Sequence, residues 1–238
     1  ETFVSISILI PARWASTRFN GKPLAKLNGV CLIKRVYDIC KSTGYDTTVL
    51  TDDQRIHNEI GSDCYIDVEP YENGTERCAG YVKKKQQEKL NATGYGWDED
   101  YTHYINVQGD MADVTPEIIL ATIDALKDCE VATVYTTMPK EKQDDPNTVK
   151  MVRANNRALW FGRGMTGYGE WHLGIYGYSS NALKNYPKVE SQEEQIEKLE
   201  QLRWLKNGWQ IGLKSVQYTG TEINTPEDLE EWHNKNSL

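Results

Sequence analysis

Short runs rich in β-branched and aromatic residues alternate along this chain with longer segments of helical periodicity. This alternation is typical of a mainly parallel sheet with helices on both faces. The pattern predicts strands at Ser5–Ile10, Thr48–Leu50, Tyr104–Val107, Val131–Thr136, Val149–Arg153, Leu173–Tyr178 and Gly212–Tyr218. It predicts helices at Leu32–Lys41, Glu76–Leu90, Pro116–Leu126, Glu193–Leu205 and Pro226–His233. Thr115 and Thr225 each precede a helix that opens with proline, so we expect both to cap their helices.

The sequence of 238 residues contains no internal repeat, low-complexity tract or Pro/Gly/Ser-rich linker. This length suits one large α/β domain. We therefore expect a single domain over residues 1–238, with a small antiparallel excursion around Pro146–Tyr178 beside the parallel sheet.

Two loops directly follow predicted strands and carry polar residues. The first runs from Pro11 to Leu24, and the second is Gln108–Asp110. Ligands of open α/β sheets bind beyond the carboxyl ends of the strands. These loops are therefore the places where we expect a binding site.

The first loop is basic. Arg13, Arg18 and Lys22 fall within ten residues, and Gly21 allows the backbone to approach a ligand. Three cations can neutralise several oxygens of a triphosphate, and a guanidinium can bind two oxygens at once. The alternative is an exposed basic loop without a ligand. The chain has neither GxGxxG nor GxxxxGK[ST], which argues against a usual dinucleotide site and a P-loop.

Composition narrows the function classes further. The formal net charge of −8 opposes binding to a nucleic-acid backbone. No apolar run reaches the ~18 residues of a membrane span, and the apolar Phe3–Pro11 lacks the basic leader and cleavage site of a signal peptide. The five cysteines have no CxxC spacing, which favours reduced thiols. We expect a cytoplasmic protein that binds neither membranes nor nucleic acids.

The basic loop belongs to a series of motifs that extends over nearly the whole chain. Ile10-Pro-Ala-Arg-Trp-Ala-Ser-Thr-Arg-Phe-Asn-Gly-Lys-Pro-Leu24 resembles the signature of the 3-deoxy-manno-octulosonate (Kdo) cytidylyltransferases. Further motifs follow in that family's order: Thr51–Asp53, Asn73–Arg77, Asn106–Asp110, Pro146–Lys150, His172–Tyr178, Leu199–Arg203 and Asn224–Leu229. As a set they are highly specific.

The resemblance implies a Rossmann-like fold of the nucleotide-diphospho-sugar transferase type, and a homodimer. It implies attack by the anomeric hydroxyl of a 2-keto sugar acid on the α-phosphorus of CTP, with Mg²⁺ as cofactor and pyrophosphate as leaving group. The implied nucleotide-binding residues are Ala12, Arg13, Ser16, Arg18, Lys22, Thr75, Arg77 and Gln108, of which Arg13 and Lys22 hold the triphosphate and are catalytic. Those implied to face the sugar acid are Gln108, Arg163, His172, Tyr176, Glu200 and Gln201, and the metal ligands are Asp110 and Asn224.

Each of these side chains also has an ordinary structural interpretation. Asp110 suits a hard cation at the end of a strand, but an aspartate there can equally cap a loop. His172 taken alone could be a satisfied core histidine. Glu200 and Gln201 could be exposed residues of a helix.

Three departures from the family pattern bear on the site. Asn224 stands where the family usually has a metal-binding aspartate, and Glu222 is close enough in sequence to supply the missing charge. Asn73 and Glu76 replace the common Ser and Asp. The segment Phe161–Tyr168 differs from the family, and the stretch before His172 is short. The alternatives are therefore a cytidylyltransferase for another acidic substrate, such as an amino-Kdo, another ulosonic acid or a phosphonate, and a non-catalytic nucleotide-binding relative.

Overall fold

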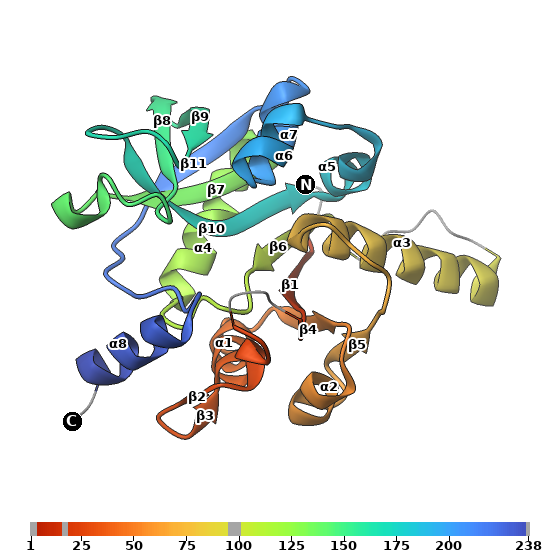
Figure 1. Cartoon of the computed structure of the whole chain (residues 1–238). Helices are drawn as coiled ribbons and strands as arrows, with labels where there is room; N and C mark the ends of the chain where they lie inside the picture. Colours follow the sequence, from red (N-terminus) through yellow and green to blue (C-terminus); the bar gives the residue numbers. More distant parts are fainter. Residues whose placement is uncertain (1–3, 16–18, 95–100, 237–238) are drawn as a thin grey trace.

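The computed structural model describes residues 4–15, 19–94 and 101–236, and its centre is one twisted sheet (Figure 1). Within the described residues the sheet has nine strands in the order β5-β4-β1-β6-β10-β7-β11-β9-β8. Their bounds are β1 Ile6–Ala12, β4 Asp46–Thr51, β5 Cys64–Ile66, β6 His103–Val107, β7 Val131–Thr136, β8 Lys150–Ala154, β9 Arg157–Gly162, β10 Glu170–Ser179 and β11 Ile211–Ser215. A short hairpin of β2 (Lys26–Leu27) and β3 (Val30–Cys31) stands apart from this sheet.

The sheet is mixed, so the expectation of a mainly parallel sheet needs correction. Strands β5, β4, β1 and β6 are parallel, as are β7 and β11, but β10 lies between β6 and β7 and is antiparallel to both. The hydrophobic pattern of β10 shows only that it is buried, because a buried strand has the same pattern in either direction. The predicted excursion at Pro146–Tyr178 contains the antiparallel pair β8–β9 at one edge, but its last strand is this central β10.

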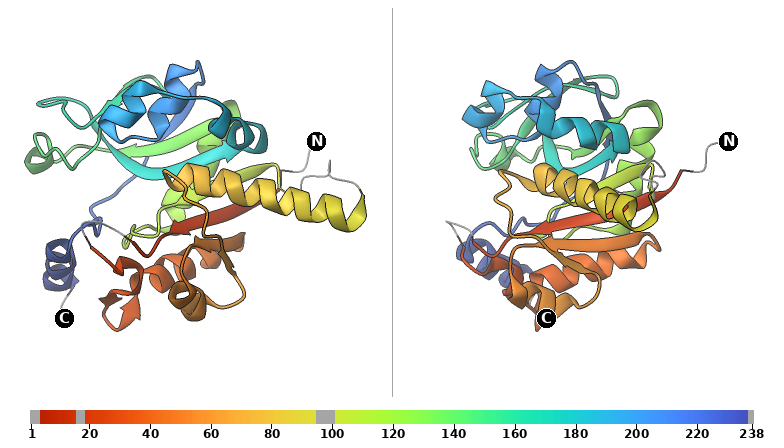
Figure 2. Two further views of the ribbon diagram at one scale, coloured as in Figure 1. Left: turned by 45° about the vertical axis from the view of Figure 1, so that its right-hand side comes forward. Right: turned by 90° about the vertical axis from the view of Figure 1, so that its right-hand side faces the viewer.

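Helices cover both faces of the sheet (Figures 1 and 2). One face packs against α1, α2, α4 and the C-terminal α8, and the other against α3, α5 and α7, with α6 packed on α7. The α-helices are α1 Leu32–Ser42, α2 Gln54–Ile60, α3 Gly74–Thr93, α4 Pro116–Ala125, α5 Ser180–Asn185, α6 Gln192–Glu197, α7 Gln201–Lys206 and α8 Pro226–Asn236. Short 3-10 turns are η1 Lys22–Leu24, η2 Leu126–Asp128, η3 Lys140–Lys142 and η4 Tyr186–Lys188.

The two predicted caps are confirmed. The side chain of Thr115 accepts a hydrogen bond from the Ile118 N–H, and that of Thr225 accepts one from the Asp228 N–H at 3.2 Å. Both helices then open with proline, whose missing N–H costs nothing at this position. The sequence signal therefore located both helix starts correctly.

The single helix expected at Glu193–Leu205 is wrong. The chain forms α6, leaves the helix at Lys198 with a left-handed φ of 57°, and starts α7 at Gln201. The buried residues of α7 are Gln201–Trp204, whereas α6 buries only Glu194 and leaves Ile196 exposed, so the apolar residues at this spacing do not mark one continuous buried face. The break matters for the site, since Glu200 lies in the connection and lines the cavity described below.

No helix among the described residues is both long and apolar enough to cross a membrane.

Candidate active site

A cavity of about 860 Å³ opens at the carboxyl ends of β1 and β6, where the sequence predicted a site. Its walls come from the loops after these two strands, the loop before α3, the α6–α7 segment, and single residues after β9 and before α8. The lining residues are Pro11, Ala12, Arg13, Lys22, Pro23, Tyr71, Glu72, Asn73, Gly74, Arg77, Gln108, Gly109, Asp110, Arg163, Glu194, Gln195, Lys198, Leu199, Glu200 and Asn224.

The basic loop is folded tightly at the edge of this cavity. Gly21 has φ 72°, and a Cβ on it would meet the Trp14 ring at 2.9 Å, so only glycine fits there. The Gly21 N–H donates to the Trp14 carbonyl at 3.2 Å. This closure brings Arg13 and Lys22 to the same cavity. Ser16 and Arg18, which the sequence also assigns to the nucleotide, lie outside the described residues.

Opposite charges meet where the loops after β1 and β6 line the cavity. The Lys22 Nζ lies 2.7 Å from Asp110 Oδ2, and both side chains are largely shielded from solvent. Such a pair holds the ammonium and the carboxylate in position before any ligand binds.

Asp110 has two oxygen-bearing neighbours near the start of α8. The Ile223 N–H donates to the Asp110 carbonyl at 3.4 Å, which brings Glu222 and Asn224 to this side. Burial, and then the negative charge of Asp110, raise the pKa of Glu222 to about 7. Nowhere in residues 4–15, 19–94 or 101–236 do three or more His, Cys, Asp or Glu side chains gather as metal ligands. The Asp110 carboxylate and the Asn224 amide nevertheless form an oxygen donor set that fits Mg²⁺, which commonly takes its other ligands from phosphates and water.

The nucleotide-side residues Thr75 and Arg77 lie at the start of α3. Arg77 lines the cavity, and its Nη1 donates to the Asp67 carbonyl at 2.8 Å. Thr75 is buried behind the wall, where its N–H donates to Glu200 Oε2 at 2.8 Å and its hydroxyl contacts the Tyr178 hydroxyl at 2.6 Å. Ala12 lines the cavity next to Arg13.

Three of the six residues assigned to the sugar acid line the cavity together. The Gln108 Nε2 donates to Glu200 Oε1 at 3.2 Å, and burial raises the pKa of the Glu200 carboxyl above its ordinary value. Arg163 is held by its own backbone N–H, which donates to Glu197, and by its Nη1, which donates to the Asn147 carbonyl. The helix interpretation of Glu200 as an exposed residue is wrong, because its carboxylate accepts two hydrogen bonds at the cavity wall.

The other three, His172, Tyr176 and Gln201, are buried and are absent from the cavity lining. The Tyr176 hydroxyl donates to Gln201 Oε1 at 3.0 Å, and the Gln201 Nε2 has no hydrogen-bond partner among the described residues. His172 Nε2 lies 3.0 Å from the Thr133 hydroxyl. Burial, and then the charge of Arg163, lower the pKa of His172 to about 3, so its ring is neutral.

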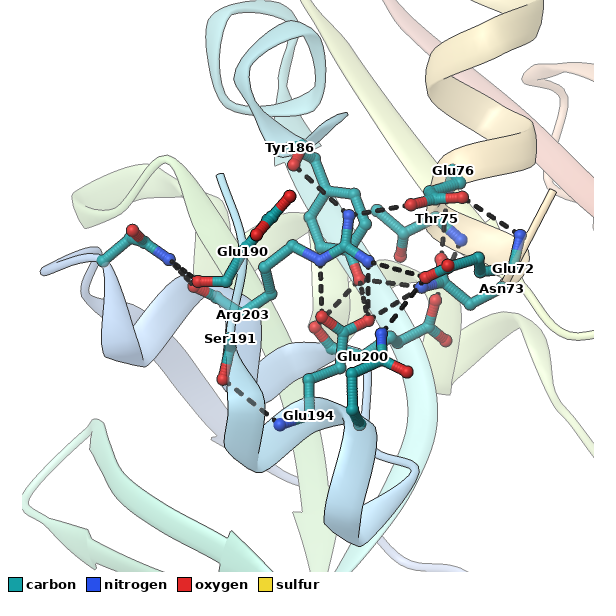
Figure 3. A network of polar contacts seen from close by, with 12 residues as sticks. Glu72, Asn73, Thr75, Glu76, Tyr186, Glu190, Ser191, Glu194, Glu200 and Arg203 are labelled. Carbon is teal, nitrogen blue, oxygen red and sulfur yellow. Dashed lines mark hydrogen bonds and ion pairs between the residues drawn. The ribbon is translucent and has the colours of Figure 1, made fainter. Parts of the chain in front are cut away.

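Sequence reasoning missed three cavity residues in and directly after α6, and a buried arginine that binds one of them. Glu194, Gln195 and Lys198 line the cavity, and Arg203 binds Glu194 and Glu76 behind it (Figure 3). Charged residues at these spacings are typical of a solvated helix face. Of the three, Glu194 is buried and Gln195 and Lys198 are exposed parts of the lining, and the sequence carries no signal for the break at Lys198.

The fold and the cavity together define a nucleotidyltransferase. The cytidylyltransferase family model matches residues 7–215. A 3-deoxy-manno-octulosonate cytidylyltransferase of Thermodesulfovibrio yellowstonii is 38% identical, over 93% of this chain and 94% of that protein. An 8-amino-3,8-dideoxy-manno-octulosonate cytidylyltransferase of Shewanella pealeana is 33% identical, over 95% of this chain and 96% of that protein.

A solved structure agrees with these relatives. CMP:2-keto-3-deoxy-manno-octonic acid synthetase complexed with CTP superimposes with a TM-score of 0.83 and 30% identity, covering 97% of this chain and 98% of that one. The chain belongs to the cytidylyltransferase family, among the 3-deoxy-manno-octulosonate cytidylyltransferases and their close relatives.

Proposed function

We propose that this protein, as one domain over residues 1–238, transfers CMP from CTP to the anomeric hydroxyl of 3-deoxy-manno-octulosonate or a close analogue and releases pyrophosphate. The observation that carries the proposal is the cavity at the ends of β1 and β6, which holds Arg13, Lys22 and Asp110 together. The similarity to a synthetase solved with CTP supports it over nearly the whole chain.

We assign the cavity a phosphate side and a sugar side. Arg13 and Lys22 would neutralise the triphosphate and the charge that grows on the departing pyrophosphate, a transfer that depends mainly on positioning and electrostatics. Gln108, Arg163 and Glu200 line the remaining wall, where a cation and two hydrogen-bonding groups suit a hydroxylated carboxylic acid.

We propose Mg²⁺ as the cofactor, held by Asp110 and Asn224, with Glu222 beside them. A magnesium ion bound there supplies electrostatic stabilisation of the triphosphate oxygens. Asp110 and Asn224 both line the cavity, and their oxygen donors would suit such an ion, which commonly takes further ligands from phosphates and water.

The test is a pyrophosphate-release assay with CTP, magnesium and a panel of sugar acids, read together with product mass. We expect a CMP-sugar with 3-deoxy-manno-octulosonate, loss of activity with EDTA, and poor use of ATP, because a pocket shaped for a pyrimidine leaves polar groups unpaired against a purine. Equal turnover of ATP and CTP would contradict the assignment. No pyrophosphate with any sugar acid would favour a non-catalytic nucleotide-binding relative.

A second candidate substrate is the 8-amino analogue of the same sugar acid. It is favoured by the 33% identity to the enzyme of Shewanella pealeana, which is named for that substrate and is similar over almost its full length. The reacting carbon and the nucleotide are the same in both cases. Including the amino sugar, another ulosonic acid and a phosphonate in the panel therefore decides the acceptor directly.

We further propose a homodimer and a cytoplasmic location. The exposed apolar side chains Leu159 and Tyr168, in and after β9, would be covered by a second copy packed at this edge of the sheet. All five cysteines are free thiols, as is typical of a reducing compartment. Light scattering after size-exclusion chromatography tests the dimer.

A further inference from the structure

A buried arginine joins the two walls of the cavity. Arg203 of α7 is only 4% exposed, and its guanidinium contacts carboxylates from two different elements (Figure 3). Its Nη2 donates to Glu194 Oε1 of α6 at 2.8 Å, and its Nη1 donates to Glu76 Oε1 in the first turn of α3 at 2.8 Å. The guanidinium carbon lies 4.1 Å from the centre of the Tyr186 ring.

The loop before α3 is held by the same cluster. Asn73 caps α3, since its Oδ1 accepts the Glu76 N–H at 2.9 Å. Its Nδ2 donates to Glu194 Oε1 and to the Tyr186 hydroxyl, each at 3.0 Å. A serine cap has no second polar group that could make these bonds, so Asn73 ties the helix start to α6 as well as capping it.

The tied segments are two neighbouring parts of the cavity lining. Asn73, Gly74 and Arg77 line the cavity at the start of α3, and Glu194, Lys198 and Glu200 line it from α6 and the connection to α7. We assign the first part to the nucleotide side and the second to the sugar side. The Thr75 N–H also donates to Glu200 Oε2 at 2.8 Å, one residue away from Glu76. A shift of α3 relative to α6 and α7 would therefore displace groups on both sides of the cavity at once.

A buried charge cluster of this kind adds little to stability compared with apolar packing, since desolvation offsets most of the attraction. The Arg203 guanidinium instead fixes the relative positions of its partners, because a planar, rigid group holds two carboxylates in set directions. We propose that Arg203 is a positioning residue that, through Glu76 and Glu194, holds the nucleotide side and the sugar side of the cavity in register for transfer. The proposal rests on the proposed function.

Replacing Arg203 itself leaves the Glu194 carboxylate buried without its partner, which destabilises the fold. The decisive substitution is therefore made on the α3 side. Glu76→Met removes the closer of the two acceptors for Arg203 on the α3 side, leaving the Glu72 carboxylate at 3.5 Å, and keeps the Arg203–Glu194 pair in place. Glu76→Gln keeps an oxygen at the same reach and serves as the rescue. The matched control is Lys206→Met, which breaks the Lys206–Glu193 ion pair between the same helices α6 and α7 without touching α3.

The measurements are CTP affinity by calorimetry, KM for each substrate, kcat, and the thermal midpoint. We expect Glu76→Met to raise the KM of both CTP and the sugar acid and to lower kcat/KM by up to about 10²-fold, as misplacement of reacting groups by ~1 Å does. Glu76→Gln should recover most of this loss, and Lys206→Met should match the unaltered enzyme. In combination with Arg203→Lys, the effect of Glu76→Met should be less than additive.

A purely structural role predicts another result. Glu76→Met would then lower the thermal midpoint while the folded enzyme kept its normal KM and kcat below that midpoint, and this outcome would overturn the proposal. If the unaltered protein binds CTP but forms no product, the calorimetric comparison alone decides the positioning role. If the unaltered protein does not bind CTP, the proposed function and this inference both fail.

Discussion

At the scale of single residues, the phosphate end of the cavity is short of fixed negative charge. Asp110 is a carboxylate, but Lys22 already neutralises it at 2.7 Å. Glu222 lies close by, yet its pKa of about 7, raised by burial and then by Asp110, leaves it only partly ionised at neutral pH. Asn224 contributes an uncharged oxygen. A divalent cation therefore meets less negative charge here than two aspartates would supply.

We predict that Asn224→Asp lowers the magnesium concentration needed for half-maximal activity. The aspartate keeps an oxygen at the same place and adds one negative charge to the ion's surroundings, which strengthens binding of a hard cation. Magnesium titrations of pyrophosphate release at saturating CTP measure the effect.

The control for that titration is Asn155→Asp, which makes the same change of charge in the exposed turn between β8 and β9, away from the cavity. It should leave the titration unchanged. The competing idea is that Glu222 already completes the site, in which case a new carboxylate adds repulsion and no affinity. An unchanged or higher half-saturating concentration in Asn224→Asp would establish that alternative.

Individual site residues were predictable where they follow a strand. The loops after β1 and β6 contain Lys22, Gln108 and Asp110. Loops that follow parallel strands meet at the same edge of the sheet, so the order of strands and loops along the chain was enough to place these residues together. The buried pairing of Glu194 with Arg203 was not predictable, because the chain leaves the helix between them at the left-handed residue Lys198. A lysine carries no preference for that conformation that could be seen in a sequence.

At the scale of elements, the packing of α4 on the sheet depends on a row of small residues. Gly177 of β10, Ala132 of β7 and Gly212 of β11 are aligned side by side across three neighbouring strands. A Cβ on Gly212 would lie 2.6 Å from the Ala125 carbonyl at the end of α4, and one on Gly177 would lie 2.7 Å from the Leu126 side chain. The row lets the end of the helix lie directly on the sheet.

We predict that Gly212→Ala destabilises the protein by about 1–3 kcal/mol, as overpacking against a rigid neighbour does. The neighbour is a backbone carbonyl of α4, so relief requires the helix to move. Urea unfolding should show a lower midpoint with an unchanged slope.

The matched substitution is Gly164→Ala, where a Cβ would meet nothing within 4 Å. It should leave the urea midpoint near that of the unaltered protein. Equal midpoints for both variants would mean that α4 adjusts freely, and the small-residue row would then have no role in packing.

The longer elements were predictable in place better than in their order in the sheet. Strand β10 was expected at Leu173–Tyr178 and is found at Glu170–Ser179, but its antiparallel insertion between β6 and β7 was not foreseen. Whether a strand runs parallel or antiparallel to its neighbours depends on the end of the sheet at which the chain enters it. The short elements α2, β5, β9 and α5 were missed because three to seven residues hold too little periodicity to identify them.

At the scale of the whole molecule, the site exists only when distant parts of the chain are assembled. Residues from Pro11 to Asp110 supply one part of the cavity lining, and residues from Arg163 to Asn224 supply the rest. The stability of the whole fold is therefore a condition for activity. One buried group, His172, makes that stability depend on pH.

His172 is 3% exposed and lies in β10 against Phe161, with ring centres 4.8 Å apart. The Thr133 hydroxyl donates to the Ile175 carbonyl at 2.6 Å, so it accepts from His172 Nε2, which carries the proton of the neutral ring. Burial, and then the charge of Arg163, lower the pKa of this histidine from 6.5 to about 3 in the folded protein. The unfolded chain therefore takes up a proton at a pH where the folded protein does not.

We predict that His172 causes a loss of stability as the pH falls below about 6.5, and that His172→Gln removes this loss. Between that pH and about 3, the unfolded state binds one more proton at this position, so the free energy of unfolding falls with the pH by at most about 1.4 kcal/mol per unit. Above that window the histidine is neutral in both states and contributes no pH dependence. The glutamine amide can still donate to Thr133 but does not titrate.

Urea unfolding of both proteins at pH 7.5, 6.5, 5.5 and 4.5, roughly one unit apart across the window, measures the difference. The difference between the two free energies of unfolding should stay constant from pH 7.5 to 6.5 and shift in favour of the glutamine variant below. Parallel curves over the whole range would show that the folded protein protonates His172 as readily as the unfolded chain does.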